Sequence, residues 1–102
     1  MIHVVAEIEL KPGCRAEYLK MFKAHTVKVR AEKGCVSYAP VVDAVGAPMT
    51  GHPPRENVVT ILEQWQSLAD LEAHSRAPHQ AEFRKQAGAW VAKGRVEVFQ
   101  EA

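Results

Sequence analysis

The side chains most able to do chemistry gather between residues 63 and 83. Glu63 and Trp65 are two positions apart in an apolar run, and His74 and His79 follow within the next fifteen positions. An imidazole titrates near pH 6.5 and can therefore accept or donate a proton at neutral pH. An indole face can stack on a planar ring, which contributes about 0.5–1.5 kcal/mol beyond area burial. These residue types suit a site that holds a flat molecule and exchanges a proton with it.

Each of these four residues also has a purely structural interpretation. Trp65 can be a core aromatic, and His74 can be a packed histidine near the C-terminal end of a short helix. Glu63 would cost free energy among apolar neighbours unless it is paired or protonated. It either orients a histidine, carries a raised pKa, or forms a salt bridge at the end of a strand. His79 can cap its helix or border the pocket, and spacing alone leaves these alternatives open.

Three further residues are candidates for binding a small molecule. His25 lies between Phe22 and Val29 at helical spacing, and we expect it to face the same pocket. Tyr38 and Phe83 are predicted core aromatics that contribute to the wall of the slot. All three, together with His79, are therefore expected as substrate-binding residues rather than catalytic ones.

Five histidines raise the question of a metal site. His74 and His79 are five positions apart with a proline between them, unlike the i, i+4 pair of a helical zinc site. No third ligand is evident, and no cluster of cysteines and histidines has zinc spacing. We therefore expect no metal and no other cofactor.

The periodicity of the apolar residues predicts the elements that position these side chains. In chain order, the sequence predicts a strand at residues 2–10, a helix at 14–32, a strand at 35–43, a strand at 57–66, a short helix from Ser67, a helix from Pro78 to about Gly94, and a strand at 95–99. Ser67 and Asp70 form a predicted capping box, and Pro40 favours a sheet edge for its strand. The Gly- and Pro-rich stretch between Ala44 and Glu56 is a predicted long loop, whose role the sequence leaves open.

This order predicts an α+β ferredoxin-like split βαβ sandwich with a four-stranded antiparallel sheet. Helices would cover one face of the sheet, with Trp65 and Glu63 on the covered side. The other face would be left bare, and two sheet edges would stay open. Because exposed faces and edges favour self-association, we expect a homodimer in which two sheets close into an α/β barrel.

The composition and charge of the chain bear on its domain number and on the classes of partner it binds. A chain of 102 residues, with 47% hydrophobic and 25% charged residues, is expected to form one domain over residues 1–102. The formal net charge of +1 gives no indication of nucleic-acid or membrane binding. The N-terminus does not look like a secretory signal, so Cys14 and Cys35 are expected as free thiols in the cytoplasm.

The chain resembles the antibiotic biosynthesis monooxygenase family, which includes quinol and anthrone oxygenases. The resemblance rests on AEIELKPG near the start, on GCVSY after the first helix, and above all on three spaced motifs. These motifs are E-x-W at Glu63 and Trp65, L-x-x-H ending at His74, and P-H-x-x-x-F from Pro78 to Phe83. The resemblance covers nearly the whole chain and implies a dimeric α/β barrel.

The resemblance implies that the site is an oxygenase site. We expect a cofactor-independent monooxygenase that oxidises a quinol, an anthrone or a similar small hydroxylated aromatic with O2. His74 is then the first choice as base or substrate hydrogen-bonding group, with Trp65 and Glu63 completing the catalytic set.

Other branches of the family remain as alternatives. A haem-degrading or isomerase-like enzyme, or a non-catalytic dimeric binding module, would use the same pocket. In the haem-degrading branch an asparagine on the first strand works with the tryptophan and the histidine. The corresponding position here falls near Ala6, which weakens the haem interpretation.

Overall fold

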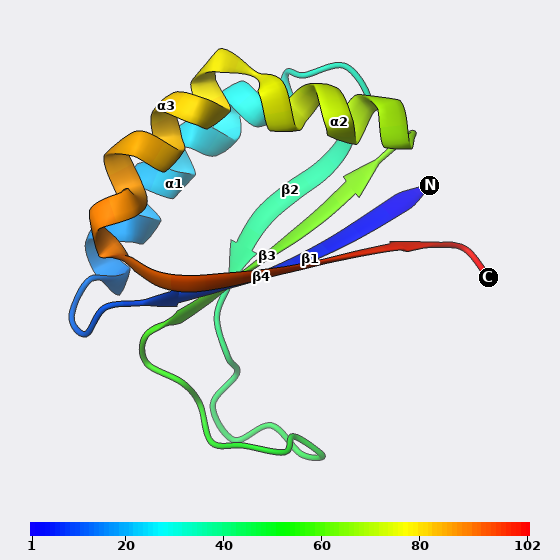
Figure 1. Ribbon diagram of the computed structural model, residues 1–102. Coiled ribbons are helices and arrows are strands. Elements are labelled where there is room, and N and C mark those ends of the chain that lie inside the picture. The colour runs from blue at the N-terminus through cyan, green and yellow to red at the C-terminus, as the bar shows by residue number, and fades with distance from the viewer.

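The computed structural model describes residues 1–102 and contains a four-stranded antiparallel sheet with helices on one side of it (Figure 1). The elements are β1 (Ile2–Leu10), α1 (Arg15–Arg30), β2 (Cys35–Val41), β3 (Val58–Trp65), α2 (Leu68–Arg76), α3 (Pro78–Ala87), the short 3-10 helix η1 (Gly88–Trp90) and β4 (Val91–Gln100). The predicted α+β ferredoxin-like fold is confirmed. None of the helices is long and apolar enough to cross a lipid bilayer.

The strand order β2-β3-β1-β4 places β3, which carries Glu63 and Trp65, in the interior of the sheet between β2 and β1. In the register of β1 with β3, Ile2 lies opposite Trp65 and Val4 lies opposite Glu63. Residues that lie opposite each other point to the same face, so Glu63 and Trp65 share the side of the core residues Ile2 and Val4. Strand β2 is an edge strand, as Pro40 predicted.

The helices cover the sheet unevenly. Helix α1 packs chiefly on β2 and α3, while no helix packs extensively on β4. Val96 and Val98 lie opposite Ala6 and Val4 of β1 and therefore point to the helix side, yet they are 63% and 49% exposed. The helix layer thus leaves a gap above β4, and this gap opens into the interior.

The C-terminal third differs from the predicted boundaries. The helix ends at Ala87, not near Gly94, and Trp90 lies in η1 rather than on a helical stripe. Strand β4 begins at Val91 and pairs along the whole of β1, from Leu10 to Ile2. The backbone hydrogen bonds gained in this long ladder outweigh the helical periodicity that the sequence shows up to Val91.

Two short-range signals are confirmed in the middle of the chain. The side chain of Ser67 accepts a hydrogen bond from the backbone nitrogen of Asp70 at 3.1 Å, so it caps α2. The turn after α1 uses Gly34 at φ +80°, a backbone conformation that favours glycine. The side chain of Asp70 lies where a β-carbon at Gly34 would stand, so this turn and the start of α2 pack directly together.

Residues 42–57 form a loop on the side of the sheet opposite the helices (Figure 1). Its two ends are joined by Arg55, which binds both carboxylate oxygens of Asp43 at 2.8 and 3.1 Å. Arg55 also reaches Glu7 on the bare face of β1 at 2.8 Å. The loop hangs from the bare side of the sheet, whereas the cavity lies on the helix side.

Candidate active site

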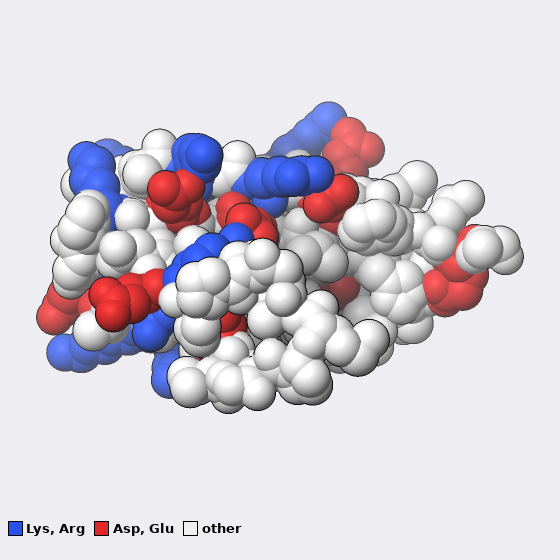
Figure 2. Space-filling view, turned by 90° about the horizontal axis from the view of Figure 1, so that it is seen from below, with Lys and Arg blue, Asp and Glu red and all other residues white.

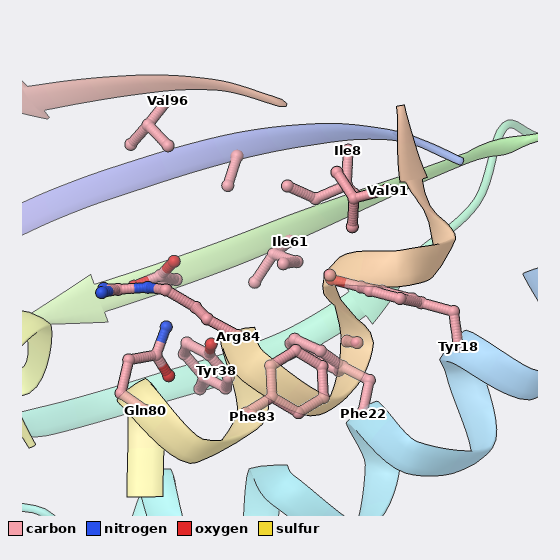
Figure 3. Close-up of a pocket in the computed structure, with 14 residues that line it drawn as sticks. Ile8, Tyr18, Phe22, Tyr38, Ile61, Gln80, Phe83, Arg84, Val91 and Val96 are labelled. Carbon is pink, nitrogen blue, oxygen red and sulfur yellow. The ribbon is translucent and has the colours of Figure 1, made fainter. Parts of the chain in front are cut away.

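A cavity of about 470 Å³ lies between the inner face of the sheet and helices α1 and α3 (Figure 3). Ten of its fourteen lining residues are hydrophobic, so it can exclude water from most of a bound ring. Ile8, Val91 and the ring of Tyr18 form one end of it. Burial raises the pKa of Tyr18 to about 12, so its hydroxyl stays neutral.

Polar side chains occupy the other end of the cavity. Glu63 comes from β3, while Gln80 and Arg84 come from successive turns of α3. Tyr38 of β2 is paired with Glu63 on the neighbouring strand β3, and it also lines the cavity. Burial raises the pKa of the Tyr38 hydroxyl, so it remains a neutral hydrogen-bonding group. The cavity is therefore apolar at one end and rich in hydrogen-bonding groups at the other.

Glu63 is the one carboxylate on the cavity wall. It is 8% exposed, and its Oε1 accepts a hydrogen bond from the indole Nε1–H of Trp65 at 2.9 Å. Burial raises the pKa of Glu63, and the bond from Trp65 opposes part of that rise. A carboxylate in these surroundings is a stronger proton acceptor than one in water.

Trp65 and His74 lie beside Glu63 but do not line the cavity. The Trp65 ring is fully buried, and its centroid is 4.8 Å from that of His74, with the planes tilted by 34°. The His74 ring in turn lies 5.5 Å from that of Tyr38. The structure thus brings Glu63, Trp65 and His74 together in one cluster, of which only Glu63 faces the open space.

Glu32 holds the two histidines that the sequence singled out. Its Oε2 is 2.9 Å from Nδ1 of His74 and 2.7 Å from Nε2 of His79. Sequence reasoning missed Glu32, although it offered a signal. An acidic residue in the last turn before the stop at Gly34 opposes the helix dipole, which is an unusual placement unless the carboxylate has a partner.

The bond to Glu32 also orients His74. Nδ1 is the nitrogen of His74 that has a protein partner, and no buried side-chain nitrogen or oxygen in the molecule lacks one. Nε2 of His74 must therefore reach accessible space. His79 is more exposed than His74 and borders a shallow surface pocket between α1 and α3 rather than the main cavity.

His25 supports the polar end of the cavity from behind. Its Nε2 lies 2.7 Å from Oε1 of Gln80, and its ring stacks on Phe83 at 4.4 Å with a 14° angle between planes. Burial lowers the pKa of His25, which favours the neutral ring. His25 does not line the main cavity, whereas Phe83 and Tyr38 do. The roles predicted for these residues remain predictions.

Ala6, near which the family resemblance places the haem-branch asparagine, lies on the cavity wall. Its methyl group offers no hydrogen bond there. No amide of the first strand therefore faces the cavity, and the haem-degrading alternative gains nothing from the structure.

Comparison with known proteins agrees with this architecture. A protein from Escherichia coli (strain K12) named probable quinol monooxygenase YgiN is 40% identical over 82 residues, which cover 78% of this chain and 77% of that protein. The crystal structure of a conserved protein from Methanosarcina mazei Go1 superposes with a TM-score of 0.82 at 22% identity, over 99% of this chain and 92% of the other. The structure of Rv0793 from Mycobacterium tuberculosis gives a TM-score of 0.80 at 24% identity, over 99% and 94%.

The two structural matches establish the fold alone, because their identities are low. The model of the antibiotic biosynthesis monooxygenase family matches residues 1–86. These residues include the cavity residues of β1, α1, β2 and β3, and the whole of helix α3 except Ala87. Together with the 40% identity above, this match shows that the chain belongs to the antibiotic biosynthesis monooxygenase family.

Proposed function

We propose that this protein is a monooxygenase that binds a small, flat, hydroxylated aromatic such as a quinol or an anthrone in the cavity and oxidises it with O2. The observation that carries the proposal is a largely apolar cavity with one buried carboxylate, Glu63, on its wall. The name of the relative YgiN supports the substrate class.

The chemistry needs only a few groups from the protein. Once deprotonated, a quinol or anthrone is electron-rich enough to pass an electron to O2. Glu63 is placed to take that proton, and the surrounding apolar wall keeps the anion from water. One oxygen atom then enters the product and the other leaves as water with two hydrogens of the substrate. The substrate supplies all four electrons, as when a quinol becomes a hydroxyquinone or an anthrone becomes an anthraquinone. The proposal requires no metal or other cofactor.

Glu63 is preferred over His74 as the base because Glu63 faces the cavity. His74, the first choice from the sequence, remains an alternative because its Nε2 reaches accessible space. In the preferred assignment, Trp65 holds the Glu63 carboxylate through Nε1–H, and His74 packs behind Trp65. Trp65 then acts as a positioning residue rather than a stacking wall.

We also propose that the protein works as a homodimer. The bare face of the sheet carries half-buried Val5 with the exposed side chains of Leu62 and Phe99, which are 44% and 48% exposed. Figure 2 looks onto this side of the molecule, and its uncharged area includes the loop that hangs below the sheet in Figure 1. A second copy of the chain would cover the apolar centre of this face.

Oxygen consumption by the purified protein tests the proposed reaction. With a quinol or anthrone, uptake should exceed that of a substrate blank and of boiled protein, and chelators should not reduce it. Glu63→Gln keeps an acceptor for Trp65 Nε1–H but removes the base, so the rate should fall by about 10² to 10⁴. Glu82→Gln on the exposed face of α3 is the matched control and should leave the rate unchanged.

The same measurement separates the two candidate bases. If His74→Ala slows the reaction as strongly as Glu63→Gln does, or if Glu63→Gln has no effect, the assignment of Glu63 is wrong. Uptake no greater than the blanks across a panel of quinols and anthrones would reject the monooxygenase and favour a binding module or an isomerase-like enzyme.

A further inference from the structure

We infer that the polar end of the cavity binds an anionic substituent of the ligand, and that the preferred ligands are hydroxyaryl carboxylates. The site consists of the guanidinium of Arg84 and the amide NH2 of Gln80, beside Glu63. This inference rests on the proposed function, because it names the substrate class of the same cavity.

Arg84 is the only cation on the cavity wall, and it forms no ion pair with the protein. Other arginines of the molecule, such as Arg55 and Arg76, bind carboxylates of their own chain. Arg84 instead donates one hydrogen bond from Nη2 to the backbone oxygen of Ser75 at 3.3 Å. This tether holds the guanidinium near α2 and leaves most of its five donors free for a ligand.

Gln80 adds a second donor with a defined direction. Burial lowers the pKa of His25, so the neutral ring can donate its Nε2–H to Oε1 of Gln80, 2.7 Å away. That bond occupies the amide oxygen and turns the NH2 group the other way. Figure 3 shows the amide nitrogen of Gln80 on the side of Arg84, with the oxygen turned away. Two donor groups therefore converge on one part of the cavity.

The proton acceptor lies at the same end. Along β3, Glu63 is two residues beyond Ile61 toward α2, and Arg84 reaches that end through Ser75 of α2. A ligand whose hydroxyl faces Glu63 would thus place a neighbouring carboxylate near Arg84 and Gln80. The apolar remainder of the cavity would hold the rings. A planar fork of guanidinium donors matches the two oxygens of a carboxylate.

A pair of stable probes tests this site without turnover. 1-Hydroxy-2-naphthoate carries a carboxylate beside its hydroxyl, and 1-naphthol has the same rings and hydroxyl without it. Titration calorimetry at about 0.15 M ionic strength, where exposed charges are substantially screened, should show about tenfold tighter binding of the carboxylate by the wild-type protein.

Variants on one helix separate a local contact from a general charge effect. Arg84→Gln should remove about tenfold of the affinity for 1-hydroxy-2-naphthoate and leave 1-naphthol within about twofold. Gln80→Leu should remove a smaller part in the same selective way. Lys85→Gln removes one positive charge next to Arg84 on a residue outside the cavity, so it should change neither affinity.

Two results would overturn the inference. In the first, the wild-type protein binds the two probes equally well or binds neither. In the second, Arg84→Gln weakens both probes alike, which would mean that the side chain only supports the fold of the cavity. The proposed reaction can fail separately. If the carboxylate probe binds selectively but no quinol or anthrone gives oxygen uptake, the anion site stands and the monooxygenase does not.

Discussion

At the scale of single residues, Glu63 supplies the one carboxylate on the cavity wall. Its carboxylate lies among Ile61, Tyr38 and the apolar wall, and its pKa is raised because burial disfavours the charged form. A raised pKa in the folded state means that the folded protein binds this proton more tightly than the unfolded chain does. The stabilising effect of protonation is complete below the unfolded pKa and is lost as the pH rises through the folded pKa.

We therefore predict that Glu63→Gln stabilises the protein at neutral pH while it removes activity. The glutamine oxygen can still accept the Trp65 Nε1–H bond, and no buried charge remains. The gain in free energy of unfolding should be largest near pH 7.5 and should shrink as the pH falls toward 4. Urea denaturation at several pH values measures this trend. A gain that is constant with pH would show that the charge of Glu63 is not its cause.

A second prediction concerns Glu32, which accepts hydrogen bonds from both His74 and His79. Glu32→Gln replaces the carboxylate that both histidines share with a neutral amide, so both hydrogen bonds lose their charged acceptor and an NH2 group faces Nδ1 of His74 where Oε1 stood. The free energy of unfolding should fall by about 1–3 kcal/mol. Glu72→Gln breaks an exposed ion pair with Arg76 and is the control, with an expected effect below about 1 kcal/mol. Equal effects in urea denaturation would contradict the role given to Glu32.

At the scale of elements, the turn between α1 and β2 is joined to the start of α2. Gly13 and Gly34 both have φ near +80°, so alanine at either position meets the same backbone strain. Only Gly34 also meets a neighbour, because the side chain of Asp70 fills the space beside it, whereas nothing lies within 4 Å at Gly13. Comparing the alanine variants of Gly13 and Gly34 therefore separates the energetic cost of packing from the cost of the backbone conformation.

We predict that Gly13→Ala costs about 1–2 kcal/mol of unfolding free energy, and that Gly34→Ala costs clearly more. Thermal and urea unfolding of the two variants gives the difference. Adding Asp70→Ala to Gly34→Ala should recover the excess, although the loss of Asp70 has a cost of its own, which the Asp70→Ala single variant measures. If both glycine variants are equally destabilised, the close approach of Asp70 has no energetic consequence.

Sequence patterns predicted these elements well where the signal is local. The alternation in β1 and β3, the cap at Ser67 and the proline at the start of α3 are all short-range features, and the structure has each of them. The end of α3 was misplaced because the chain after Ala87 keeps an apolar spacing that also suits a helix. What decides it is pairing with β1, more than eighty positions away, which no local pattern reports.

In the candidate site, too, some features follow from local sequence signals and others depend on long-range packing. Glu63, Trp65 and His74 were singled out by their residue types together with the family resemblance, and they lie together in the structure. Which of them faces a cavity depends on how α3 packs over the sheet, and the sequence does not encode that in any local spacing. Arg84 and Gln80 stand out only when the cavity is known, since a polar residue on an amphipathic helix is ordinary.

At the scale of the whole molecule, the bare face of the sheet predicts the oligomeric state. Leu62→Asp places a charge at the centre of this face and should convert the dimer to a monomer. Val27→Asp makes the same change on α1, where the side chain is 70% exposed, and should leave the dimer intact. Sedimentation equilibrium at micromolar concentration distinguishes the two. A wild-type protein that is monomeric under these conditions would reject the proposed dimer.

The bond between Arg55 and Asp43 has a consequence for how this chain can vary. The ion pair joins the two ends of the loop of residues 42–57. The segment between Asp43 and Arg55 is therefore held apart from the rest of the fold. Closing a longer loop costs only about 0.6 kcal/mol for each doubling of its length. A peptide tag or a small reporter domain inserted between Val45 and Met49, which are 90% and fully exposed, should therefore leave the sheet intact. The contact between Arg55 and Asp43 thus makes this loop a part of the molecule where new sequence can be added at low cost.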